Sequence, residues 1–120
     1  MMRWPDPPAQ VAPYVSVLGP ELALDFLLAF GGAELYLARS PQRRSRVVRL
    51  VGAERARALA AAAERLPSRV PLAKPWCAAM LRAQGLPVAE IARRLHASDV
   101  AVRGWLRRAA PPDTRQPSLF

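Results

Sequence analysis

Cysteine and histidine are nearly absent from this sequence, with one residue of each. Cys77 therefore has no partner for an intramolecular disulfide, and with only His96 to help it cannot complete a cysteine-based zinc site. No apolar run approaches the roughly 20 residues of a membrane-spanning helix, and the N-terminus lacks the pattern of an export signal, which favours the cytoplasm. Phosphate-binding glycine loops and clustered carboxylates are also missing. We expect no enzyme activity, cofactor or metal.

Acidic residues are scarce in the second part of the chain. Residues 1–42 contain two arginines and four acidic residues, whereas residues 43–120 contain sixteen basic residues and five acidic ones. The formal net charge is +9, and every basic residue except Lys74 is an arginine. Such asymmetry favours a polyanionic partner, most commonly nucleic acid. A solvated basic surface is the alternative that charge alone leaves open.

The patterns predict a mostly α protein, with a helical dimerisation region that contains short β-strands and a C-terminal helix-turn-helix. Residues 1–16 and 111–120 are rich in proline and are expected to be an extended N-terminus and a flexible tail. Residues 17–74 are predicted to form the dimerisation region. Residues 75–110 are predicted to form a DNA-binding domain.

The most apolar helix is predicted at residues 20–30. Pro20 suits a first helical turn, Glu21 favours the positive end of the helix dipole, and Gly31 and Gly32 provide a stop. Leucine and phenylalanine cover nearly the whole circumference, which requires burial on several sides. We expect that cover from a second subunit in a homodimer, with complete cover by later helices as the alternative.

Two stretches, residues 17–41 and 50–75, repeat one pattern. In each, a glycine is followed two residues later by glutamate, then by a helix, a strand-like segment, a basic residue and proline. The helices expected besides that at 20–30 are 45–51 and 53–66, the latter with a stripe of Ala56, Leu59, Ala60, Ala63 and Leu66. The strand-like segments are "AELYLA" at 33–38 and "RVPLA" at 69–73. The pattern predicts a helix–strand unit used twice.

Residues 86–109, "LPVAEIARRLHASDVAVRGWLRRA", give the clearest functional signal. Ala92 is small enough for two helices to approach, Ser98 is a good N-cap, and His96 occupies a turn position where glycine is common. The spacing of the apolar positions fits a helix-turn-helix: Ile91, Ala92, Leu95, Ala97, Val102 and Trp105. We expect Trp105 to be a core residue. A helical hairpin that does not bind DNA is the alternative.

If this motif binds DNA, the outward residues at the start of its second helix enter the major groove. These are Ser98, Asp99, Val100, Arg103 and Arg107. Arg103 is the best candidate for reading guanine, because its guanidinium can bond O6 and N7 together. Asp99 suits either a contact to cytosine or, preferably, a helix cap. Phosphate contacts are expected from Arg93, Arg94 and Arg108, and Arg107 also suits one.

Residues 17–109 resemble the Mor family, the middle-operon transcription activators of Mu-type phages. The resemblance rests on "FGGAELYLARSP", "RLVGAERARALAAAAERL", "RVPLAKP" and the terminal motif. It implies a homodimer that binds double-stranded DNA near promoters and helps to recruit RNA polymerase. It also implies a strand before the helix-turn-helix, here Leu66–Lys74, that pairs across the dimer and approaches the minor groove. Arg69 and Lys74 are then the minor-groove candidates.

The expected function is therefore a sequence-specific transcription regulator of phage or prophage origin, associated with the nucleoid. The C-terminal "QPSLF" supports an alternative, since Gln116, Leu119 and Phe120 resemble the anchors of peptides that dock on the bacterial sliding clamp. That alternative is an accessory protein of replication or repair. A dimeric protein-interaction module without DNA binding is the second alternative. Cys77 follows a helix start, which lowers a thiol pKa, but a buried structural role is favoured.

Overall fold

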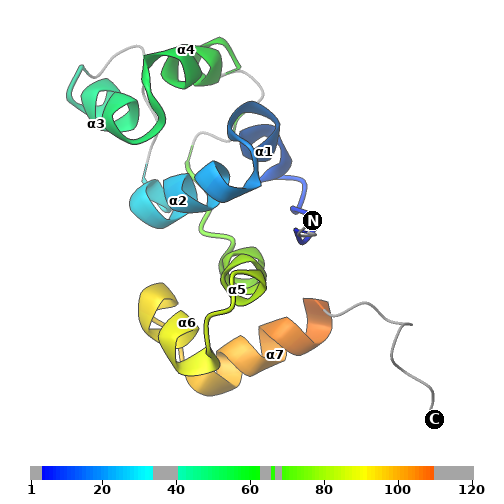
Figure 1. The fold of residues 1–120 in the computed structure, drawn as a ribbon. Helices are drawn as coiled ribbons and strands as arrows, with labels where there is room; N and C mark the ends of the chain where they lie inside the picture. Colours follow the sequence, from blue (N-terminus) through cyan, green and yellow to red (C-terminus); the bar gives the residue numbers. More distant parts are fainter. Residues whose placement is uncertain (1–3, 34–40, 63–65, 67–68, 110–120) are drawn as a thin grey trace. The chain divides into compact units, whose positions relative to one another are not determined.

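The computed structural model describes residues 4–33, 41–62, 66 and 69–109, and these residues are mostly helical (Figure 1). Seven α-helices lie within them: α1 Ala12–Leu18, α2 Pro20–Phe30, α3 Pro41–Val51, α4 Ala53–Ala61, α5 Lys74–Ala83, α6 Val88–Leu95 and α7 Asp99–Ala109. The chain divides into two compact units, one of Asp6–Ala73 and one of Lys74–Phe120 with Met1–Pro5. The division falls beside the boundary expected at residues 74–75. The prediction of a mostly α protein is confirmed.

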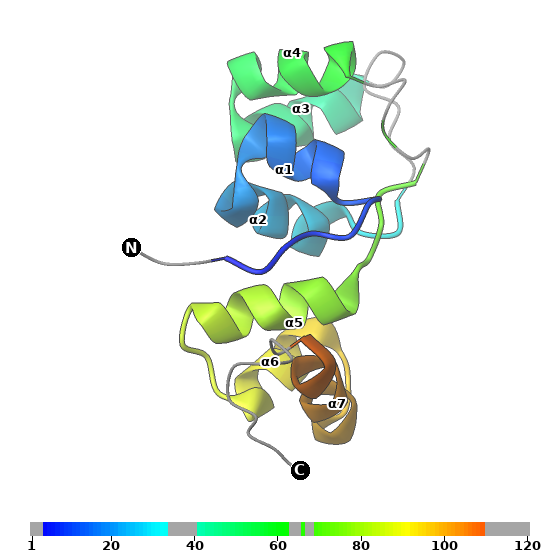
Figure 2. The ribbon, with the colours of Figure 1, turned by 90° about the vertical axis from the view of Figure 1, so that its right-hand side faces the viewer.

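The first unit is built from two helix pairs, α1–α2 and α3–α4, that lie side by side (Figure 2). Gly19 joins the first pair with φ 83° and ψ 161°, and Gly52 joins the second with φ 91° and ψ 158°. The Gly19 N–H donates to the Val15 carbonyl at 2.7 Å, and the Gly52 N–H donates to the Val48 carbonyl at 2.8 Å. Positive φ at both glycines ends one helix and begins the next without a loop.

The internal repeat therefore contains a helix–glycine–helix unit. In the second copy no strand forms at 69–73, whereas the strand expected in the first copy lies almost entirely outside the described residues. Glu21 and Glu54 lie in the first turns of α2 and α4, where the helix dipole favours a negative charge. Helix α1 forms in spite of its proline. Pro13 lies in the first turn of the helix, where a missing N–H breaks no helical hydrogen bond. Residues 12–16, expected to be extended, thus begin the first helix pair.

Helix α2 begins at Pro20 and ends before Gly31, as predicted. Its buried residues are Ala23, Leu24, Phe26 and Leu27, while Leu28 is 40% exposed. The Phe26 ring lies 5.3 Å from that of Tyr14 and 4.9 Å from that of Phe30, centroid to centroid. Helices α1 and α3 both contact α2. The chain itself therefore covers most of this apolar helix, which was the alternative considered above, and α2 does not by itself require a second subunit.

No strand occurs in the part of the chain that the structure describes. The Gly32 N–H donates to the Val70 carbonyl at 2.7 Å, and the Val70 N–H donates to the Ala33 carbonyl at 2.8 Å. This short backbone pairing ends at Pro71, which has no N–H to donate. Lys74 already belongs to α5. The strand predicted over Leu66–Lys74 does not form in the described residues of that segment, and of the predicted strand at 33–38 only the first residue lies among the described ones.

Helix α4 is shorter than its sequence pattern predicts. It ends at Ala61, and Ala62 makes the last backbone bonds of the helix. Ala56, Leu59 and Leu66 are buried as expected, whereas Ala60 is exposed. Ala63 lies outside the described residues. Because 3.6 residues form one turn, the buried side of this short helix follows the i, i+3 positions 56, 59 and 62, which leaves Ala60 outside the stripe.

The second unit consists of α5, α6 and α7, each in contact with the other two. Helix α5 supplies the most buried residues of the three helices, namely Trp76, Cys77, Ala78, Met80 and Leu81. The Trp76 indole N–H donates to the Pro5 carbonyl at 3.2 Å. This bond attaches the start of the chain to the three-helix unit and satisfies a polar group that is otherwise buried.

None of the described helices is long and apolar enough to cross a membrane alone. The pair α1 and α2 meets the length and composition criteria together, but it is bent by 119°.

Tyr14 provides a test of this core. It is fully buried, its hydroxyl has no hydrogen-bond partner among the described residues, and burial raises its pKa to about 12. We expect Tyr14→Phe to stabilise the protein by about 1–2 kcal/mol in chemical denaturation at neutral pH, because the variant removes a buried unsatisfied hydroxyl. A loss of stability would show that the hydroxyl is satisfied.

The same variant has an alkaline signature. The ordinary pKa of tyrosine is 10.0, so above that pH the unfolded chain loses the proton while the folded chain retains it up to about 12. Wild-type stability therefore falls as pH rises from about 10 to 12, and Tyr14→Phe should flatten that part of the profile. Burial also raises the pKa of the Cys77 thiol, from 9.0 to about 12, so some alkaline loss should persist in the variant.

Candidate nucleic-acid interface

The candidate interface is built on α6 and α7, whose facing sides are buried. Ile91 and Val102 are fully buried, and Leu95 and Ala92 nearly so, as the motif predicts. Trp105 is only half-buried, which corrects its assignment to the core. It lies three residues after Val102, which places it about 60° around the helix from that residue. Trp105 therefore lies at the edge of the buried face.

The turn after α6 depends on one residue with a left-handed backbone conformation. His96 adopts φ 53° and ψ 50°, the conformation that glycine takes most easily. The following Ala97 N–H donates to the Ala92 carbonyl at 2.9 Å, which closes the end of α6. His96 therefore has the backbone conformation expected at a turn position where glycine is common.

Ser98 starts α7 by a side-chain cap. Its Oγ accepts a hydrogen bond from the Ala101 N–H at 3.0 Å, which confirms Ser98 as the N-cap. Asp99 is the first residue of α7 and lies opposite Arg103, with 3.9 Å between Asp99 Oδ2 and Arg103 Nη2. The cap that we preferred for Asp99 is therefore supplied by its neighbour. Asp99 and Arg103 are both more than half exposed, so their ion pair is weak and open to exchange.

The outer face of α7 is mostly basic, with acidic Asp99 and apolar Val100 at its start. Arg103, Arg107 and Arg108 are exposed. Val100 is 75% exposed, more than Leu28 or Leu72, the other exposed large apolar residues of the described chain. All the predicted major-groove residues thus lie on one accessible helix end or face, from Ser98 to Arg107.

Gly104 was missed from the sequence, and it is buried although Arg103 and Arg107 near it in α7 are exposed. It lies one turn after Val100, and a Cβ added there would be 3.5 Å from Arg108 Nη1 and 3.9 Å from Arg107 Nη2. The guanidinium groups of both arginines therefore lie close to the bare backbone. Glycine in a helix interior costs about 1 kcal/mol relative to alanine, and that cost was the available sequence signal.

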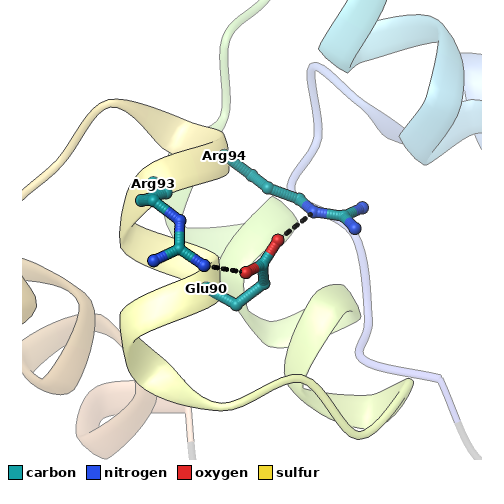
Figure 3. A network of polar contacts seen from close by, with 3 residues as sticks. All are labelled: Glu90, Arg93 and Arg94. Carbon is teal, nitrogen blue, oxygen red and sulfur yellow. Dashed lines mark hydrogen bonds and ion pairs between the residues drawn. The ribbon is translucent and has the colours of Figure 1, made fainter.

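Glu90 joins the two phosphate candidates of α6 (Figure 3). Arg94 Nε donates to Glu90 Oε2 at 3.2 Å, and Arg93 Nη2 donates to Glu90 Oε1. The hydrogen bonds from Arg94 and Arg93 hold the pKa of Glu90 below its usual range. The sequence analysis treated both arginines as available for phosphates and overlooked the carboxylate at i−3 and i−4 that competes for them.

The structure does not support a strand that contacts DNA with Arg69 and Lys74. Arg69 Nη1 donates to the Gly32 carbonyl at 3.1 Å within the first unit, whereas Lys74 is the partly buried first residue of α5 in the second unit. Gln116, Leu119 and Phe120, the clamp-docking candidates, lie outside the described residues.

Cys77 is almost fully buried and, as noted, its thiol pKa is raised to about 12. Burial rather than the helix dipole therefore dominates this thiol, in agreement with the structural role that was favoured. Among residues 4–33, 41–62, 66 and 69–109, no three His, Cys, Asp or Glu side chains are grouped to hold a metal ion.

Comparison with known proteins gave no match to a protein-family model, to a curated protein or to a solved structure.

The turn provides a test of the interface scaffold. We expect His96→Gly to raise the free energy of unfolding by up to about 1 kcal/mol, because glycine adopts the left-handed conformation without Cβ strain. His96→Val should instead lower it by about 1–3 kcal/mol, since a β-branched residue disfavours positive φ. Thermal denaturation of both variants measures the difference. Equal stability of the glycine and valine variants would contradict the left-handed turn.

Proposed function

We propose that this chain is a sequence-specific regulator of transcription that binds double-stranded DNA as a homodimer, with residues 86–109 as a helix-turn-helix. The observation that supports this most directly is the division of α7 into two sides. Val102 is buried against the rest of the three-helix unit, whereas Val100, Arg103 and Arg107 are exposed. A recognition helix needs this arrangement, because its inner side must be fixed while its outer side contacts bases.

Charge supports the same function. The net charge of +9 arises from residues 43–120, in which basic residues outnumber acidic ones by sixteen to five. Exposed arginines flank the start of α7 on one side, at Arg93 and Arg94, and its end on the other, at Arg107 and Arg108. Contacts from both ends would hold the helix across a groove by its phosphates while the middle of the helix reads bases.

The homodimer is part of this proposal, because one short recognition helix buries little surface and two half-sites give the affinity that a regulator needs. The partly exposed Leu28 is compatible with a subunit contact, since α2 is otherwise covered by the chain itself. The resemblance to Mor activators extends the proposal to a phage or prophage origin, and to RNA polymerase as a partner.

DNA binding by the full chain provides the main test. We expect selection from a random duplex library to recover one operator with two half-sites, with an affinity that falls steeply with salt because phosphate contacts release counterions. Arg103→Ala should weaken operator binding by about 1–3 kcal/mol and relax preference at one position, since Arg103 reads guanine. Arg108→Ala is the matched control, which should weaken all duplexes alike. Binding that ignores sequence and salt would contradict the proposal and favour a protein-interaction module.

Glu90 allows a test in the opposite direction. Glu90→Gln should strengthen binding to any duplex and make the dependence of log K on log salt steeper, by up to about 0.9 for each arginine that gains a phosphate. The reason is that a neutral amide no longer competes for Arg93 and Arg94. Fluorescence anisotropy across a salt series measures this slope. An unchanged slope would show that neither arginine contacts phosphate.

A further inference from the structure

The outer face of α7 contains an apolar residue that charge alone does not explain. Val100 lies on this face with the exposed arginines Arg103 and Arg107, and it keeps 75% of its surface accessible to solvent. A face intended only for phosphates gains nothing from Val100, because a valine side chain cannot donate a hydrogen bond.

We infer that Val100 reads the 5-methyl group of a thymine in the major groove; the inference rests on the proposed function. The thymine methyl is the one apolar group that a base pair presents in the major groove, and small apolar side chains are its usual partners. Val100 is the second residue of α7, two residues after the Ser98 cap, and the first turn is where a recognition helix meets base edges.

The spacing also fixes where the thymine should lie. Val100 and Arg103 are three residues apart, which is about 4.5 Å along a helix axis, and successive bases rise by about 3.4 Å. If Arg103 reads a guanine, the thymine should lie one or two base pairs away from it. An operator half-site should therefore contain a thymine and a guanine as neighbours or separated by one pair.

The test replaces each thymine of the selected operator in turn by deoxyuridine, which removes only the 5-methyl group. We expect one thymine per half-site to be sensitive, with binding weakened about fourfold by the loss of one buried methyl contact. Val100→Ala should weaken binding to the thymine operator by a similar factor. On the deoxyuridine operator the same variant should cause no further loss, because its partner is already absent.

Two results would overturn the inference while leaving the proposed function intact: specific binding that is insensitive to every deoxyuridine, or losses from Val100→Ala and deoxyuridine that multiply. If no duplex is selected at all, the proposed function itself fails. The experiment therefore separates the two claims.

Discussion

The candidate interface depends on the burial of Ile91, Leu95 and Val102 between α5, α6 and α7. These side chains fix the rotation of α7, because a helix that buries Val102 must turn Val100 outward. The turn at His96 and the cap at Ser98 then fix where α7 begins. Without this small core the arginines of α7 would be a set of charges with no defined geometry, able to attract a polyanion but not to distinguish one sequence from another.

In the second unit, several arginines are paired with carboxylates on the same helix, so the net charge of the chain does not describe their surroundings. Glu90 binds both Arg93 and Arg94, and Asp99 faces Arg103 at 3.9 Å. Each exposed pair contributes little to stability, but it sets what a phosphate or base must displace. A net charge of +9 therefore overstates the charge available to a polyanion. In the proposed function, such pairing would restrain indiscriminate binding, since a correct site must offer the arginines better partners than these carboxylates.

The first unit shows how one backbone requirement can be used twice. Gly19 and Gly52 have nearly the same dihedral angles, and each allows two helices to meet with no intervening loop. The repeat was visible in the sequence at these glycines and at Glu21 and Glu54. What it encoded was misread, because alternating residues such as those of 69–73 satisfy a strand pattern whether or not a neighbouring strand exists. A single pairing with Gly32 and Ala33 takes up the backbone of Val70, and Pro71 prevents more.

Local chemistry determined what the sequence could predict: helix starts at Pro20 and Ser98, the glycine-like turn at His96, and the apolar positions that α6 and α7 bury. These follow from backbone sterics, capping and helical periodicity, which act over a few residues. Tertiary structure alone decided the rest. It covered α2 from within the chain, left Trp105 at the edge of the core and assigned Glu90 to both arginines. Which neighbour fills a given space depends on residues far apart in the chain, and no local pattern contains that information.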